Sequence, residues 1–209
     1  MYAKKSRFPL WPLIIAALII AGSLIGAAVG KYIKTESYTG SLQVTAKLAD
    51  VTLLEHEAVR SADGSYTLSD KTATENTYTL IPGLDIPKDP FITIENKTSI
   101  EAYLFVEVVD NTPNGAIGYT VSTDWRIVNG VTGKHGGTVY VYAKGGTLTV
   151  LDDTNTSADP IYILTDNKIT VSQTLNSTET DDTLTFYAAM GEVAASDSGD
   201  PKVVYESIK

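Results

Sequence analysis

Hydrophobic and polar residues alternate most clearly within residues 80–110, which read LIPGLDIPKDPFITIENKTSIEAYLFVEVVD. A bend at Pro82, Gly83 and Pro87 precedes two predicted strands, 90–95 and 100–109, because proline fixes its own φ and cannot donate to a ladder. One face of the second strand is apolar and carries Ala102, Leu104, Val106 and Val108. The other carries Glu101, Tyr103, Phe105 and Glu107. This period of two predicts a central strand whose second face is partly covered.

Similar short alternating stretches, rich in Thr, Val, Ile and Tyr, recur along most of the chain. They predict further strands at 41–47, 51–59, 66–68, 77–81, 119–122, 125–128, 138–143, 147–151, 161–164, 168–173 and 183–190. Between them lie tight-turn pairs such as Asp63-Gly64 and Asn129-Gly130. Many short strands at this spacing indicate an all-β fold, an antiparallel sandwich or barrel.

Only the C-terminal residues depart from this strand pattern. Asp200 followed by Pro201 is a helix start, with a capping carboxylate and a proline at the first helical position. Val204 and Ile208 are four residues apart and share one helical face. A short C-terminal helix is therefore predicted.

The N-terminus has the pattern of a secretory signal peptide. Lys4, Lys5 and Arg7 precede an uncharged apolar run, residues 13–29, that ends among small residues. Cleavage is expected between Gly30 and Lys31 by a signal peptidase, although cleavage after Ala27 or Ala28 is also sterically allowed. The competing interpretation is an uncleaved anchor, since about twenty apolar residues span a bilayer. In either case the membrane is contacted only through this segment, and the remainder is expected outside the cytoplasm.

The chain is accordingly divided into a signal peptide, residues 1–30, a mature N-terminal segment, residues 31–40, and a β-sandwich domain, residues 41–209. The N-terminal segment is polar and alternates only weakly. It is expected either to be flexible or to be extended and ordered by pairing with another chain. Its candidate pairing residues are Lys31, Tyr32, Ile33, Lys34, Thr35, Glu36, Ser37, Tyr38 and Thr39.

Composition narrows the classes of partner. The net charge is −9, and the part after residue 30 is more acidic still, because the first thirty residues contain three basic residues and no acidic one. Nucleic acid is an unfavourable partner for such a surface. The chain has no cysteine, which excludes disulfides, thiolate metal sites and a cysteine nucleophile.

No motif predicts a catalytic residue, a metal ligand or a cofactor site. His56-Glu57 begins like a zinc-protease motif, but Arg60 stands where the second imidazole is needed. His135 lies in a glycine-rich turn, and both histidines are interpreted as surface residues. Acidic pairs at Asp152-Asp153, Asp181-Asp182 and Asp197/Asp200 lack the spacing of a calcium loop and are interpreted as solvated turns.

Tyrosine is abundant, and Tyr140 and Tyr142 share one side of a predicted strand. They could form a carbohydrate-stacking face or ordinary cross-strand pairs, and the sequence does not decide between these.

Three segments resemble the TasA/camelysin family of exported bacterial biofilm-matrix proteins. They are SLIGAAVGKYIK at 23–34, LIPGLDIPKDPFITIENKTSIEAYLFVEV at 80–108 and TLTFYAAMGEV at 183–193. The resemblance implies a jelly-roll-like sandwich and secreted fibres in which the N-terminal segment of one subunit adds as a strand to its neighbour. The donor would then lie within residues 31–44, and residues 31–39 are the part expected outside the subunit's own fold. Camelysin is described as a metallopeptidase, but no residue here supports transferring that activity.

Three functions follow as hypotheses. The first is a non-enzymatic, secreted subunit of a matrix fibre that polymerises with itself head to tail after signal removal. The second is a monomeric cell-surface adhesion or carbohydrate-binding module. The third is a secreted metallopeptidase of the camelysin type.

Overall fold

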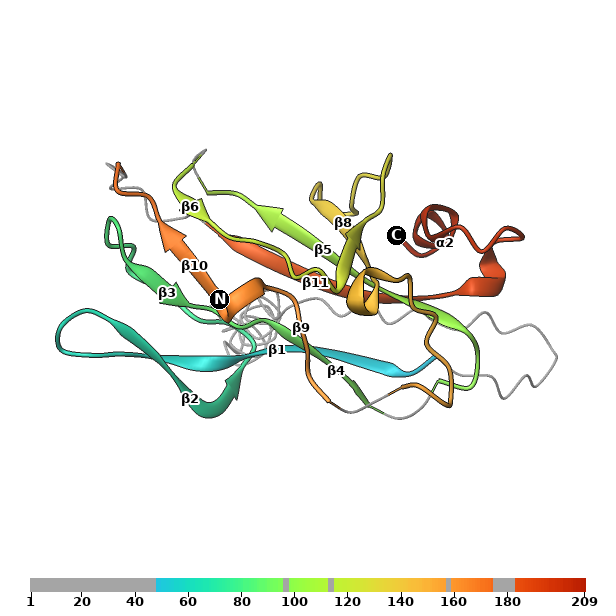
Figure 1. The fold of residues 1–209 in the computed structure, drawn as a ribbon, viewed down its shortest axis with the longest axis horizontal. Helices are drawn as coiled ribbons and strands as arrows, with labels where there is room; N and C mark the ends of the chain where they lie inside the picture. Colours follow the sequence, from blue (N-terminus) through green and yellow to red (C-terminus); the bar gives the residue numbers. More distant parts are fainter. Residues whose placement is uncertain (1–47, 96–97, 113–114, 157–158, 175–182) are drawn as a thin grey trace, which may run out of the picture. The chain divides into compact units, whose positions relative to one another are not determined.

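Eleven strands, three short 3-10 helices and one α-helix make up the part of the chain that the structure describes, residues 48–95, 98–112, 115–156, 159–174 and 183–209 of a computed structural model (Figure 1). All of these residues belong to one compact unit, Tyr32–Lys209. The second unit, Met1–Lys31, lies outside the described residues, as do the expected donor segment and the expected strand 41–47.

The strands are β1 Asp50–Arg60, β2 Tyr66–Ala73, β3 Asp85–Pro87, β4 Phe91–Glu95, β5 Ala102–Asp110, β6 Ile117–Gly118, β7 Trp125–Ile127, β8 Thr138–Tyr142, β9 Ile161–Tyr162, β10 Lys168–Val171 and β11 Leu184–Glu192. The helices are η1 Lys144–Gly146, η2 Thr165–Asn167, η3 Val193–Ala195 and α2 Pro201–Ile208.

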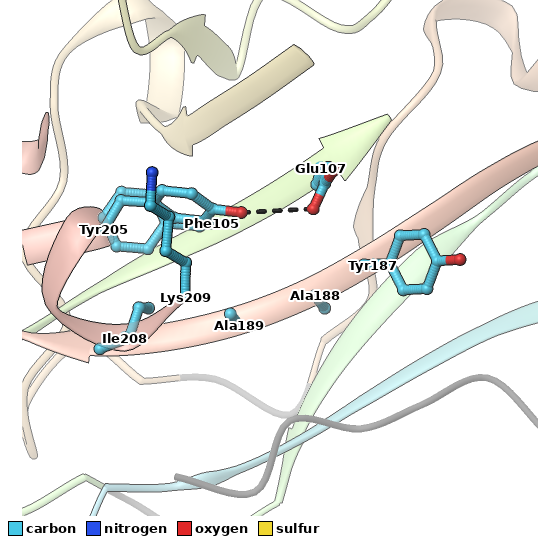
Figure 2. A pocket seen from close by; sticks show the side chains of 8 residues that line it. All are labelled: Phe105, Glu107, Tyr187, Ala188, Ala189, Tyr205, Ile208 and Lys209. Atoms are coloured by element: carbon cyan, nitrogen blue, oxygen red, sulfur yellow. Dashed lines mark hydrogen bonds between the residues drawn. The ribbon is translucent and has the colours of Figure 1, made fainter. Parts of the chain in front are cut away.

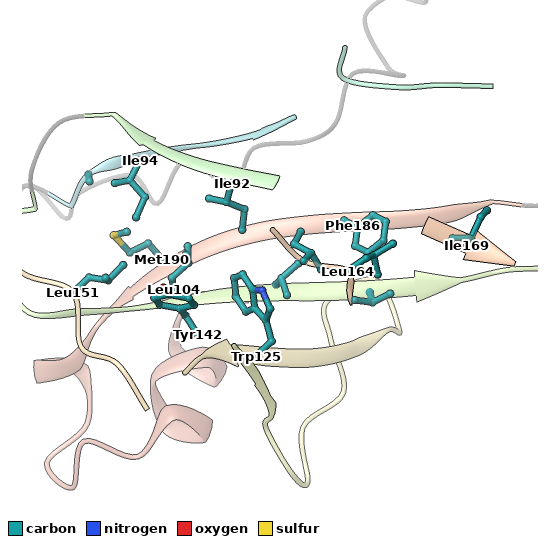
Figure 3. Close-up of a cluster of buried hydrophobic side chains, with 14 of the residues drawn as sticks. Ile92, Ile94, Leu104, Trp125, Tyr142, Leu151, Leu164, Ile169, Phe186 and Met190 are labelled. Atoms are coloured by element: carbon teal, nitrogen blue, oxygen red, sulfur yellow. The ribbon is translucent and has the colours of Figure 1, made fainter. Parts of the chain in front are cut away.

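The strands form three antiparallel sheets, in the orders β2-β1-β4-β9, β3-β10-β6 and β11-β5-β8-β7. The prediction of an all-β antiparallel fold is therefore confirmed. Ile92 and Ile94 of β4 point toward the layer that carries Leu104 and Met190, and the main apolar core lies between these two layers (Figure 3). The core forms because each strand buries one of its two alternating faces.

Strand β5 is central, as its pattern predicts, with β11 on one side and β8 on the other. Its Ala102, Leu104, Val106 and Val108 belong to the main core. The second face is covered as well: Tyr103 and Phe105 join a smaller apolar cluster with residues of α2. Helix α2 begins as predicted, with the Asp200 side chain accepting a hydrogen bond from the Lys202 backbone N–H at 2.9 Å.

Three expected strands are wrong. Residues 77–81 form no ladder, because the Thr79 backbone N–H donates to the Tyr66 hydroxyl instead, at 2.7 Å. Residues 147–151 contribute only a single bridge, Leu151 with Ala102. Residues 119–122 contribute only the bridge of Val121 with Leu164, and the ladder forms one step earlier, at β6.

One strand, β3, lies inside the bend expected at 82–87. Pro87 ends it and Ile86 anchors it in the core, so the proline occupies a strand end, where a missing N–H is tolerated. A β-bulge interrupts the β1–β2 ladder between His56 and Ala58. The Asn76 side chain fills this gap, donating to the His56 carbonyl and accepting from the Ala58 N–H, both at 2.8 Å.

Candidate functional site: the outer edge of β11

Strand β11 lies at the end of its sheet, and within the described residues it forms a ladder only with β5 (Figure 1). All nine of its residues pair with β5, from Leu184 opposite Asp110 to Glu192 opposite Ala102. Strand β1 also approaches β11, but no ladder joins these two strands. An edge strand of this length presents a row of backbone groups to whatever lies beside it.

Two hydrogen bonds just outside β11 establish which backbone groups face outward. The Asn111 N–H donates to the Thr183 carbonyl at 2.8 Å, and the Val193 N–H donates to the Glu101 carbonyl at 2.9 Å. Antiparallel ladders alternate with a period of two, so the odd-numbered residues of β11 bond to β5. The outward N–H and C=O groups therefore belong to the even-numbered residues, Leu184, Phe186, Ala188, Met190 and Glu192.

The side chains of β11 pack on both faces of the sheet. Phe186 and Met190 are buried in the main core, and Ala188 between them is small and only half-buried. On the other face, Ala189 and Tyr187 border a hollow of about 10 Å³, the size of one water molecule, whose remaining lining includes Phe105 and Ile208 (Figure 2). The edge strand is thus anchored by Phe186 and Met190 and carries a small side chain, Ala188, at its middle.

A buried carboxylate organises the chain beside this hollow. Glu107 of β5 is only 3% exposed and accepts four hydrogen bonds. Its donors are the N–H groups of His135 (2.8 Å) and Gly137 (2.9 Å), the ring Nδ1 of His135 (3.0 Å) and the Tyr205 hydroxyl (3.3 Å; Figure 2). Burial raises the pKa of Tyr205 to about 12, and the Glu107 charge adds to this rise. This arrangement holds the 133–137 turn and α2 onto β5.

His135 is connected to the edge strand as well. Its ring stacks on Tyr187 of β11, with ring centroids 3.7 Å apart and planes 13° from parallel. Sequence reasoning placed His135 in a surface turn and did not find its partner, because Glu107 is 28 residues away and reads as an ordinary outward-facing strand residue.

His56, like His135, contacts a buried carboxylate through both its backbone N–H and its ring. Its backbone N–H and ring Nδ1 contact the two carboxylate oxygens of the buried Asp89, at 3.0 and 2.6 Å. Its ring also lies 5.2 Å from that of Phe91. Each histidine therefore has its own carboxylate partner, which revises the interpretation of both as plain surface residues.

The other sequence candidates do not converge on one site. The carboxylate of Asp152 accepts hydrogen bonds from Thr154 and Asn155 within its own turn, and Asp200 caps α2. Asp181 and Asp182 lie outside the described residues. In the part of the chain that the structure describes, no three or more His, Cys, Asp or Glu side chains come together in a way that could hold a metal ion.

The Tyr140 and Tyr142 pair does not form an exposed face. Tyr142 is 8% exposed and packs edge-on against Trp125 in the core, with ring centroids 5.5 Å apart. Tyr140 packs against the same core and is half-buried. The carbohydrate-stacking interpretation of these two residues is therefore wrong, because the face they share points inward.

Within those same described ranges, no helix is both long and apolar enough to cross a membrane. Comparison with known proteins adds no neighbour: no family model matches the chain, and neither a curated protein nor a solved structure matches it significantly.

Proposed function

We propose that this protein is a secreted structural subunit that assembles with copies of itself, head to tail, into an extracellular matrix fibre or pilus-like filament. Residues 31–39 of one subunit would add as a strand along the outer edge of β11 in the next. Membership of the TasA/camelysin family of bacterial biofilm-matrix proteins, with a location at the cell surface or in the matrix, belongs to the same proposal.

The outer edge of β11 is the observation that supports this proposal. An added strand would pair with the N–H and C=O groups of the even-numbered residues, and pockets for alternate side chains would supply specificity. Because the donor and the acceptor edge are different surfaces of one subunit, the contact is head to tail, and we propose that the rotation between subunits leaves it open rather than closing a ring. Repetition of that contact makes a filament.

We further interpret the fold as jelly-roll-like. The chain passes from one four-stranded sheet to the other between β4 and β5, returns at β9 and enters the second sheet again at β11. This alternation between two facing sheets supports the interpretation. Export would depend on residues 1–30 acting as a signal helix that a signal peptidase removes before Lys31.

The assembly can be tested with two half-defective subunits. Deletion of residues 31–39 removes the donor but leaves the edge intact. Ala188→Pro removes an outward N–H at the centre of the edge, where proline is tolerated because that group bonds no neighbour within the sheet. Ala188→Ser keeps the N–H and serves as the matched control.

Each defective subunit is expected to remain monomeric in size-exclusion chromatography and electron microscopy, whereas Ala188→Ser forms filaments like the wild type. A mixture of the two defective subunits is expected to give a one-to-one dimer, because one supplies the donor and the other the edge. Filaments from the deletion variant alone, or undiminished filaments from Ala188→Pro, would overturn the proposal.

A further inference from the structure

Lys88 and Glu55 form an ion pair in the protein interior. Lys88 Nζ lies 2.8 Å from Glu55 Oε2, and the two side chains are only 10% and 8% exposed. Glu55 is on β1, and Lys88 follows the last residue of β3. The contact therefore joins the middle of β1 to the connection that leads into β4.

The surroundings of this pair are mostly apolar. Among the described residues, Glu55 is the only hydrogen-bond partner of Lys88 Nζ. The ammonium otherwise faces aromatic rings, with the ring centroids of Tyr78 at 5.4 Å and Phe186 at 5.9 Å. A buried ion pair offsets its desolvation cost only when further hydrogen bonds support it. Both charged groups are therefore largely withdrawn from water and held against each other.

Tyr78 lies beside this pair, with its ring facing the Lys88 ammonium. Its hydroxyl is buried and has no hydrogen-bond partner within the described part of the chain. Burial raises the pKa of Tyr78 above its usual range, and the charges of Glu55 and Asp89 add to this effect. The hydroxyl therefore keeps its proton at neutral pH.

We propose that Lys88 and Glu55 condense to an intramolecular amide, an isopeptide cross-link. In the reaction the Lys88 ammonium passes one proton to the Glu55 carboxylate, and the freed Nζ lone pair attacks the carboxyl carbon. The contact of 2.8 Å between Nζ and Oε2 brings Nζ near the roughly 3–3.5 Å of a near-attack geometry. The C–O bond of the acid then breaks, and its hydroxyl leaves as water with a proton from the amine. The products are one amide and one water molecule, so no oxidant or other reactant is needed.

Other ion pairs of the structure lack the features that favour amide formation between Lys88 and Glu55. Asp89 is equally buried, but both of its oxygens are engaged by His56. Lys168 and Asp85 are in contact at 2.6 Å, yet their side chains are 43% and 52% exposed, so water stabilises both charges. Among the ion pairs of the described residues, Lys88 and Glu55 form the one in which both side chains are at most 10% exposed.

The cross-link would tie together residues 33 positions apart and close a loop that contains the whole of β2. Tension entering through the N-terminal end of β1 would pass at Glu55 into the β3–β4 connection, and the β1–β2 hairpin beyond that point would be shielded. The cross-link does not depend on the proposed assembly, and its absence would leave that proposal unchanged.

The test is the mass of the full-length chain, denatured and measured whole, compared with that of Lys88→Arg. Wild type is expected to be lighter than its sequence mass by one water molecule, and a protease digest is expected to contain a branched peptide joining Glu55 to Lys88. Lys88→Arg is expected to have its full sequence mass. Lys168→Arg, the matched control at the exposed pair, is expected to lose one water as wild type does.

A wild-type chain at its full sequence mass would overturn the proposal. So would a loss of water that fragmentation assigns elsewhere, for example to a cyclised Asp63-Gly64, or one that persists in Lys88→Arg. The wild-type mass and its branched peptide decide the matter even if Lys88→Arg folds poorly.

Discussion

Glu107 holds His135 by two hydrogen bonds, one from the backbone N–H at 2.8 Å and one from the ring Nδ1 at 3.0 Å. The same carboxylate receives the N–H of Gly137 and the hydroxyl of Tyr205. One side chain of β5 thus fixes a turn between β7 and β8 and the C-terminal helix. Because His135 stacks on Tyr187, this carboxylate also supports the strand whose outer edge is the candidate assembly site.

Replacement of Glu107 is expected to destabilise the fold strongly. In Glu107→Gln the remaining oxygen can keep the backbone N–H groups of His135 and Gly137, but an NH2 group replaces Oε2. The ring Nδ1 of His135 and the Tyr205 hydroxyl would then lose their charged acceptor. The expected loss in the free energy of unfolding is about 2–3 kcal/mol, measured by chemical denaturation. Asp85→Asn removes an exposed ion pair and should leave the unfolding midpoint unchanged; a comparable loss there would contradict this account.

Gly133 is required for close approach of the turn to Glu107. A Cβ at this position would collide with the Glu107 carboxyl group. Gly133→Ala is therefore expected to cost about 1–3 kcal/mol of stability, as overpacking does, read from the same denaturation curves. Gly118→Ala is the control, because a Cβ there meets only ordinary contacts, the nearest being the Thr170 carbonyl at 3.9 Å.

Asn76 is expected to stabilise the bulged hairpin of β1 and β2. In Asn76→Ala the His56 carbonyl and the Ala58 N–H would lose their partner, at a cost of about 1–3 kcal/mol. Faster amide hydrogen exchange at Ala58, with β5 amides little changed, would place the effect in the hairpin. Lys71→Ala, an exposed change on β2, should alter neither the free energy of unfolding nor the exchange rate at Ala58.

Stability is expected to fall at alkaline pH. Burial raises the pKa of both Tyr119 and Tyr205 from 10.0 to about 12. Between these values the unfolded chain has lost protons that the folded chain keeps, so the free energy of unfolding decreases as pH rises. Below about pH 10 the two tyrosines are neutral in both states, and their full contribution to the free energy of unfolding is present.

Denaturation curves recorded from pH 9 upward, together with the ultraviolet absorbance of phenolate, check this pH dependence. Tyr205→Phe lowers stability at neutral pH, because the hydroxyl no longer donates to Glu107, but it should make the alkaline decline less steep. An unchanged slope in Tyr205→Phe would contradict the assignment of that decline to Tyr205.

Local pattern was sufficient for much of the fold. The alternation in residues 100–109 predicted a central strand whose second face is partly covered, and the two faces of β5 pack into two apolar clusters. Prediction failed where a side chain replaced a strand as the backbone's partner, as at Thr79, where the Tyr66 hydroxyl accepts the N–H. At Tyr140 and Tyr142 it left two interpretations open, because alternation assigns residues to a shared face without saying whether that face is exposed.

By itself the sequence determined the strand-rich character, the turns and the start of α2, because backbone stereochemistry and side-chain alternation act over a few residues. Only the tertiary structure decided that the outer side of β11 lacks a strand partner among the described residues, that Glu107 receives His135, and that Lys88 is buried against Glu55. Each of these depends on which distant segments pack together, and that is settled by burial of the whole apolar surface at once.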